Sequence, residues 1–146
     1  MPTTPYLLVI GTALITLTVL IHVFGLISIT RVATWFRDRF TRSSRWHQVG
    51  LTIGIVLGLF GVVSVEIWLW TAAFLVFGVA SDFDSALYLS TITYATVGYG
   101  DVVPIHGWGL LAALEGVTGF LMIGWSTAFL VTASTKFGPF RPGEHF

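Results

Sequence analysis

The sequence contains no cysteine and few charged side chains. Without cysteine it can form neither a disulfide nor a thiolate site, so the redox compartment cannot be inferred. Charged residues make up 10% of the 146 residues and hydrophobic residues 55%, a balance that is unusual for soluble domains. Metal-ligand spacing is also lacking, and Ser126 has no evident base partner, so we expect neither an enzyme nor a cofactor. The histidines are scattered at His22, His47, His106 and His145.

The charges that are present balance to a net charge of zero, but they are segregated along the chain. The segment 31–48 has a single acidic residue, Asp38, and five arginines: Arg31, Arg37, Arg39, Arg42 and Arg45. The positive-inside rule therefore places this segment in the cytoplasm and the N-terminus outside. The segregation argues against nucleic-acid binding.

Three long apolar runs follow one another, at 6–30, 49–80 and 108–135. Each exceeds the roughly 20 residues that a helix needs to cross a membrane. We therefore predict an N-terminal transmembrane helix within 1–30 and two further spans. A signal peptide is disfavoured because the first run lacks a basic n-region and a small-residue cleavage site. His22 in this run is expected to face another helix rather than to bind a ligand.

The basic segment 31–48 has two interpretations. The first is a topogenic loop. The second is a short interfacial helix that passes lipid or voltage signals to the rest of the protein. The second is favoured by an apolar stripe at helical spacing: Val32, Trp35, Phe36 and Phe40. The segment also has an arginine at every third position, a spacing that is found in voltage-sensor helices: Arg39, Arg42 and Arg45. We reject a sensor because the intervening residues are polar.

A shorter helix is predicted before residue 96. Ser81 or Asp82 can cap its N-terminus, and the helix should run to about Ala95. About 12 to 14 residues cannot span a membrane, so the helix should be re-entrant.

The stretch that follows this helix reads T-x-x-T-V-G-Y-G-D from Thr93 to Asp101. It resembles the selectivity filter of potassium channels, in which backbone carbonyls replace the hydration shell of the ion. The resemblance implies that K⁺ binds at Thr96, Val97, Gly98, Tyr99 and Gly100. Gly98 and Gly100 are the natural positions for positive φ, which turns the carbonyls to one side.

The other residues of the motif have supporting parts in this interpretation. Thr96 adds its hydroxyl as the innermost ligand, and Val97 and Tyr99 point away from the ion and wedge the loop against its surroundings. Asp101 lies at the mouth, where it concentrates cations, and Tyr88 is placed to hydrogen-bond it.

Over 49–135 the chain resembles small prokaryotic potassium channels, with an outer helix, a pore loop and an inner helix. The inner helix of this family lines a cavity and bends at a glycine, for which Gly119 and Gly124 are candidates; both are equally well explained as packing glycines. The residues expected to face the cavity are Leu121, Gly124, Ala128 and Thr132. The chain departs from common family residues at Leu89, Ile92 and Ala95, which puts inactivation behaviour in doubt.

Each pore span contains one carboxylate, Glu66 in the first and Glu115 in the second. Helix rise places them at nearly the same depth, beside the re-entrant helix. We expect a polar layer with Thr91, Thr93 or the backbone, with at least one carboxyl protonated; alternatively, each bonds the re-entrant helix independently. The outer span also has a small-residue face for close helix approach, formed by Gly50, Gly54, Gly58 and Gly61.

The sequence therefore predicts an all-α membrane protein with three transmembrane helices and a re-entrant helix. One filter per chain implies a homotetramer, in the cell membrane, in contact with lipid and K⁺. The tail 136–146 should be cytoplasmic and too short for a ligand-binding domain. The predicted function is potassium-selective conduction; the alternatives are a weakly selective cation channel and a non-conducting subunit of another channel.

Overall fold

A computed structural model describes residues 2–39 and 45–139. It contains four helices: α1 (Thr4–Arg39), α2 (Arg45–Phe77), α3 (Phe83–Tyr94) and α4 (Gly109–Phe137). The described part of the chain has no strand. Helices α1, α2 and α4 are long and apolar enough to cross a membrane, and α3, with 12 residues, is not. The all-helical class predicted from the sequence is thereby confirmed.

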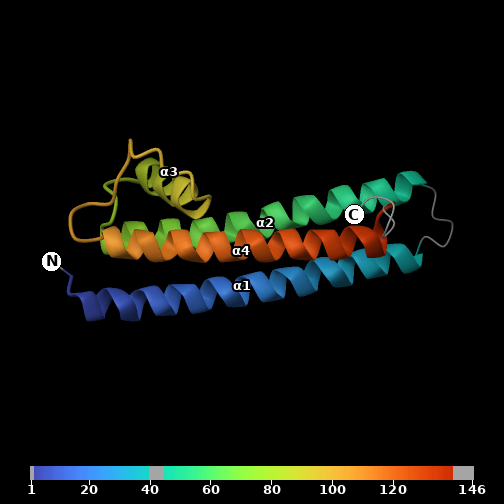
Figure 1. Cartoon of the computed structure of the whole chain (residues 1–146), viewed down its shortest axis with the longest axis horizontal. Coiled ribbons are helices and arrows are strands. Elements are labelled where there is room, and N and C mark those ends of the chain that lie inside the picture. The colour runs from blue at the N-terminus through green and yellow to red at the C-terminus, as the bar shows by residue number, and fades with distance from the viewer. Residues whose placement is uncertain (1, 40–44, 140–146) are drawn as a thin grey trace.

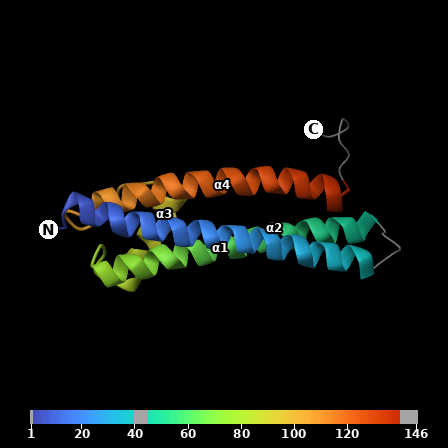
Figure 2. The ribbon, with the colours of Figure 1, turned by 90° about the horizontal axis from the view of Figure 1, so that it is seen from below.

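Helices α2 and α4 run side by side and separate the other two helices (Figure 1). α1 packs along both of them on one face, and α3 packs against both near one end of the opposite face. Seen from below, α1 lies between α2 and α4 at the α3 end and crosses α2 towards the other end (Figure 2). No Cα atom of α1 lies within 8 Å of a Cα atom of α3 among the described residues, so the backbones of these two helices are separated by the α2–α4 layer.

The first helix is longer than predicted. It continues past Thr30 to Arg39, and α2 begins at Arg45, so the residues up to 39 form neither a loop nor a separate interfacial helix. No proline or glycine interrupts residues 31–39, and Arg37 and Arg39 in the last turn are favourable at the negative end of the helix dipole. Phe40 and Arg42 lie outside the described residues.

The second helix ends three residues before the predicted Ala80. Gly78 has φ +71°, a left-handed conformation that glycine adopts without strain. Its amide donates to the Leu75 carbonyl at 3.2 Å, and the Val79 amide donates to the Phe74 carbonyl at 2.8 Å. A glycine in this conformation directly after a helix is a common helix terminator.

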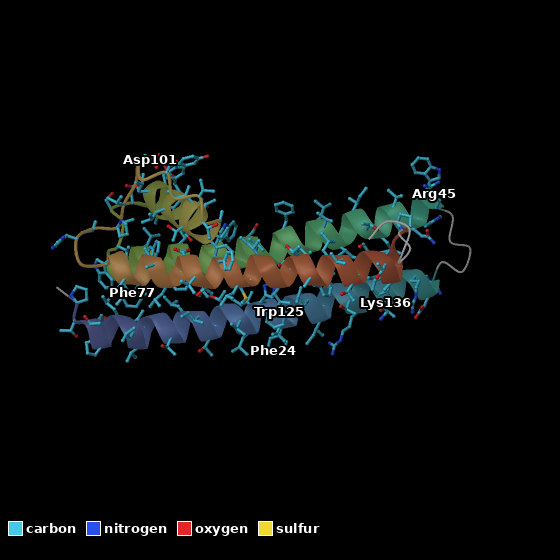
Figure 3. All side chains as sticks on the ribbon, in the orientation of Figure 1. Phe24, Arg45, Phe77, Asp101, Trp125 and Lys136 are labelled. Carbon is cyan, nitrogen blue, oxygen red and sulfur yellow. The ribbon has the colours of Figure 1, made fainter. Side chains whose placement is uncertain are left out.

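The two ends of the bundle carry opposite charge. Asp101 lies at the end occupied by α3, and Arg45 and Lys136 lie at the other end (Figure 3). α1 begins at the α3 end with Thr4, and α4 finishes at the basic end with Phe137. The start of α1 and the end of α4 therefore lie at opposite ends of the bundle, as three membrane crossings require (Figure 1).

Two apolar clusters hold the helices together, and α1 contributes to both. The cluster at the α3 end joins Leu7 and Leu14 of α1 to Trp70, Phe74 and other residues of α2, α3 and α4. The cluster at the basic end includes Leu26 and Ala33 of α1. Between membrane-spanning helices such contacts stabilise through van der Waals packing rather than through removal of apolar surface from water, and they make α1 an integral part of the fold.

Candidate functional site

The N-terminus of α3 is capped by Asp82, one of the two residues predicted for this position. The Asp82 carboxylate accepts from the Ser85 backbone N–H at 2.9 Å and from the hydroxyls of Ser81 at 2.7 Å and Ser85 at 2.8 Å. These bonds, led by the Ser85 backbone bond, lower the pKa of Asp82 to about 2. The cap is therefore ionised at neutral pH and favourable at the positive end of the α3 dipole.

The other end of α3 holds the TVGYGD loop, residues 96–101. The Thr96 amide donates to the Thr93 carbonyl at 3.0 Å. The amides of Val97 and Gly98 both donate to the Ile92 carbonyl, at 2.8 and 3.1 Å. The start of the loop is thus folded back onto the last turn of α3.

Every second residue at the start of this loop has a positive φ. The values are +58° at Thr96, +49° at Gly98 and +78° at Gly100. The two glycines are those predicted for such conformations, and Thr96 was not predicted. Since a strand points successive carbonyls to opposite sides, this alternation allows neighbouring carbonyls to share a side. Thr96 is strained by about 1–2 kcal/mol, and its bond to Thr93 helps to hold it there.

The described part of the chain does not cover the TVGYGD loop. The side chains of Val97 and Tyr99 are 49% and 75% exposed. The described residues of the chain therefore do not supply the surroundings against which these side chains were predicted to wedge. Beside the loop lies a hollow of about 370 Å³, with Thr93, Thr96 and Gly98 on one side and Ala112 and Gly116 of α4 among the residues on the other.

Asp101 is held by the residue predicted to bond it. The Tyr88 hydroxyl donates to Asp101 Oδ2 at 2.8 Å, and the Val102 amide donates to Oδ1 at 3.0 Å. The Tyr88 bond is the main cause of a pKa of Asp101 below its ordinary value. An ionised carboxylate is therefore fixed at the acidic end of the bundle.

Glu66 is fully buried and uses both carboxylate oxygens. The Tyr94 hydroxyl donates to Oε2, and His22 Nδ1 lies 2.9 Å from Oε1. His22 thus faces another helix, as predicted. One turn earlier in α1, the Thr18 hydroxyl accepts from Trp70 Nε1 of α2 at 3.0 Å.

Glu115 is also fully buried but has a different partner. The Ser90 hydroxyl lies 2.5 Å from Glu115 Oε1 and 3.1 Å from the Ile67 carbonyl. Glu115 Oε2 has no hydrogen-bond partner among the described residues. Protonation of either carboxyl stays a prediction.

The polar layer predicted with Thr91, Thr93 or the backbone is therefore wrong in its partners, whereas the alternative prediction, that each carboxyl bonds the re-entrant helix independently, is confirmed. The Thr91 hydroxyl donates within its own helix, to the Leu87 carbonyl at 2.7 Å. The two carboxyls instead bond α3 independently, at Ser90 and Tyr94. Sequence reasoning missed both residues, although their four-residue spacing places them on one helix face.

The two hinge candidates lie in different surroundings. A Cβ at Gly119 would clash with the backbone carbonyl of Tyr94, whereas a Cβ at Gly124 would meet nothing within 4 Å. Gly119 is therefore a packing glycine that lets α4 approach the end of α3, and α4 is one continuous helix.

Among the described residues, the small-residue face predicted for α2 has a close contact at one of its four glycines. A Cβ at Gly58 would lie 3.0 Å from the Ile29 side chain of α1, but Gly50, Gly54 and Gly61 have nothing within 4 Å. Two of the departures from the family pattern, Leu89 and Ile92, are buried apolar residues of α3.

One face of α4 is exposed along most of its length. Leu121 is 57% exposed, and the other residues predicted to line a cavity, Gly124, Ala128 and Thr132, are exposed as well. Their spacing places them on one side of the helix. The described residues contain no cluster of three or more metal-ligating side chains.

Comparison with known protein families gives a match that covers more than half of the chain. A family model described as ion channel matches residues 51–136, and no solved structure matches. The matched stretch includes α3, the TVGYGD loop, most of α2 and nearly all of α4. α1 lies before it.

Proposed function

This chain belongs to the ion channel family, and from that premise we propose that it is the pore-forming subunit of a potassium-selective channel. The proposal rests on one observation above all: positive φ at Thr96, Gly98 and Gly100, in a loop folded back onto a helix too short to span a membrane. Conduction is passive, and the permeant ion is K⁺.

The proposed ligands are neutral oxygens, nearly all of them backbone carbonyls. Carbonyls of the five residues would take the place of the water lost by the ion, together with the Thr96 hydroxyl: Thr96, Val97, Gly98, Tyr99 and Gly100. Gly100 supports the last turn of this path through its left-handed conformation. Irregular backbone at membrane depth is tolerated where it lines a water-filled path.

Negative charge on both sides of the TVGYGD loop suits cation conduction. The negative end of its dipole lies beside Thr96, where it favours a cation below the loop. Asp101 lies on the other side of the loop, and its pKa below the ordinary value keeps a negative charge at the mouth. Cations are attracted on both sides of the ligand path.

We propose a homotetramer because one chain supplies only one side of such a cage. Exposure of Val97 and Tyr99 is consistent with packing by other copies. In the tetramer the exposed α4 face with Leu121, Gly124 and Ala128 would line the cavity.

The charges suggest the orientation in the cell membrane. The end with Asp82 and Asp101 would lie outside, and the end with Arg37, Arg45 and Lys136 inside, by the positive-inside rule. The N-terminus would then be external and the C-terminus cytoplasmic.

The reversal potential of the purified protein in a planar bilayer, with K⁺ on one side and Na⁺ on the other, tests this function. We expect a reversal near the K⁺ equilibrium value. A reversal near zero would indicate a weakly selective cation channel, and no current would indicate a non-conducting subunit; either result contradicts the proposal.

A matched pair of variants tests the loop itself. Gly98→Ala should lower the K⁺/Na⁺ permeability ratio, because alanine is strained by about 1–2 kcal/mol at φ +49°. Gly61→Ala, in α2 with nothing within 4 Å of the new Cβ, should conduct like the unmodified protein.

A further inference from the structure

We propose that His22 of α1 is a positioning residue for the conduction loop, and that it acts through the Glu66 carboxylate and the Tyr94 hydroxyl. α1 lies before the residues matched by the family model. This inference gives it a part in selectivity, and it rests on the proposed function.

The three side chains come from three different helices and are all fully buried. His22 Nδ1 lies 2.9 Å from Glu66 Oε1, and the Tyr94 hydroxyl bonds Oε2. α1 and α3 pack on opposite faces of the α2–α4 layer (Figure 1). Glu66 therefore carries a polar connection across that layer, from α1 to the end of α3.

The orientation of the Glu66 carboxylate depends on both partners. A buried carboxylate oxygen without a hydrogen bond is costly. The terminal torsion of glutamate is soft, so a carboxylate with one partner rotates easily. Without His22, Oε1 would lose its partner, and Glu66 would no longer present Oε2 to Tyr94 in one fixed direction.

His22 is itself oriented by α4. The ring of Trp125 lies 5.3 Å from the His22 ring, centroid to centroid, and the planes are inclined by 44°. Trp125 lies in the middle of α4 (Figure 3). His22 Nε2 has no hydrogen-bond partner among the described residues, so the bond of Nδ1 to Glu66 is the one polar contact that the described structure gives this ring.

A displacement of Tyr94 would be transmitted directly to the loop. Tyr94 is the last residue of α3, two residues before Thr96 with its strained φ of +58°. Its backbone is pressed against Gly119 of α4, while its side chain is held by Glu66. Strained backbone persists only where surrounding contacts fix it, and these two contacts fix the residue that leads into the strain.

The test is the K⁺/Na⁺ permeability ratio, measured from reversal potentials of tetramers in planar bilayers. His22→Leu should lower the ratio about tenfold, which corresponds to about 1.4 kcal/mol. His22→Asn should restore most of it, because the asparagine amide occupies nearly the place of Nδ1. Tyr94→Phe should lower the ratio to a similar extent, and the double variant with His22→Leu should lower it no further.

The matched control is Thr18→Val. It breaks the buried bond between Thr18 of α1 and Trp70 of α2, one turn from His22, and leaves Glu66 and its partners in place. It should lower the thermal stability of the protein but keep the permeability ratio within about twofold. A purely structural role of α1 would make His22→Leu behave like this control.

The outcomes separate the two proposals. If the unmodified protein is not K⁺-selective, the proposed function fails. If it is selective and His22→Leu keeps its ratio, this inference alone fails. Should His22→Leu not assemble, Tyr94→Phe decides, because an unchanged ratio in that variant would also overturn the inference.

Discussion

Replacement of Gly119 by alanine should separate α4 from the end of α3. The new Cβ would clash with the Tyr94 carbonyl oxygen and would lie 2.8 Å from the Tyr94 carbonyl carbon and 2.9 Å from its Cα. All three atoms belong to the backbone, so no side chain can rotate away. The helices must move apart, or the last turn of α3 must shift.

The loss of stability in Gly119→Ala is measured against a matched variant, Gly54→Ala. Gly54 lies in α2 and lines a groove of about 770 Å³ between α1, α2 and the end of α4, and a Cβ added there would meet nothing within 4 Å. Both substitutions gain roughly 0.8–1.0 kcal/mol of helix propensity. Only Gly119→Ala adds the cost of overpacking, about 1–3 kcal/mol.

The assay compares thermal unfolding of the two variants in the same detergent. At about 2–4 °C per kcal/mol, Gly119→Ala should melt roughly 2–12 °C below Gly54→Ala. It should also lose K⁺ over Na⁺ selectivity, because Tyr94 leads into the TVGYGD loop. Equal melting points would refute the close approach of α4 to Tyr94.

Three further variants test single contacts. Tyr88→Phe removes the main bond that lowers the pKa of Asp101, so Asp101 in the variant should take up its proton at a higher pH. Because the protonated residue no longer attracts cations, acid should reduce the current at a higher pH in the variant than in the unmodified protein. Asp82→Ala should lower the melting temperature at neutral pH, and the difference should shrink as the pH falls from about 4 through the Asp82 pKa of about 2. Ser90→Ala leaves Glu115 without its hydrogen-bond partner and should cost about 1–3 kcal/mol of stability by thermal unfolding, whereas Ser90→Thr, which keeps the hydroxyl, should cost less.

Much of the fold could be predicted because the physical cause lies within one stretch of chain. Long apolar runs with almost no charge are typical of membrane-spanning helices, and three such runs correspond to α1, α2 and α4. The cap of α3 at Asp82 and the positive φ at Gly98 and Gly100 also follow from local chemistry. Helix ends were less certain: α1 passed its predicted end at Thr30 because nothing in the next nine residues breaks a helix.

Contacts between helices could not be predicted in the same way. The spans are apolar on all sides, so no polar face indicates how each helix is rotated about its axis. The sequence indicated that Glu66 and Glu115 needed partners but not that these were Tyr94 with His22, and Ser90. It likewise left Gly119 and Gly124 equivalent as hinge or packing glycines.

The sequence by itself determined the number of spans, the short helix between the last two, the segregation of charge and the glycines of the TVGYGD loop. Each depends on residues close together in the chain, through hydropathy, capping or backbone freedom. Only the tertiary structure decided that α1 reaches Glu66, that Gly119 supports Tyr94 and that Thr96 adopts a positive φ. These features depend on the rotation and register of packed helices, which arise from the fit of many side chains at once.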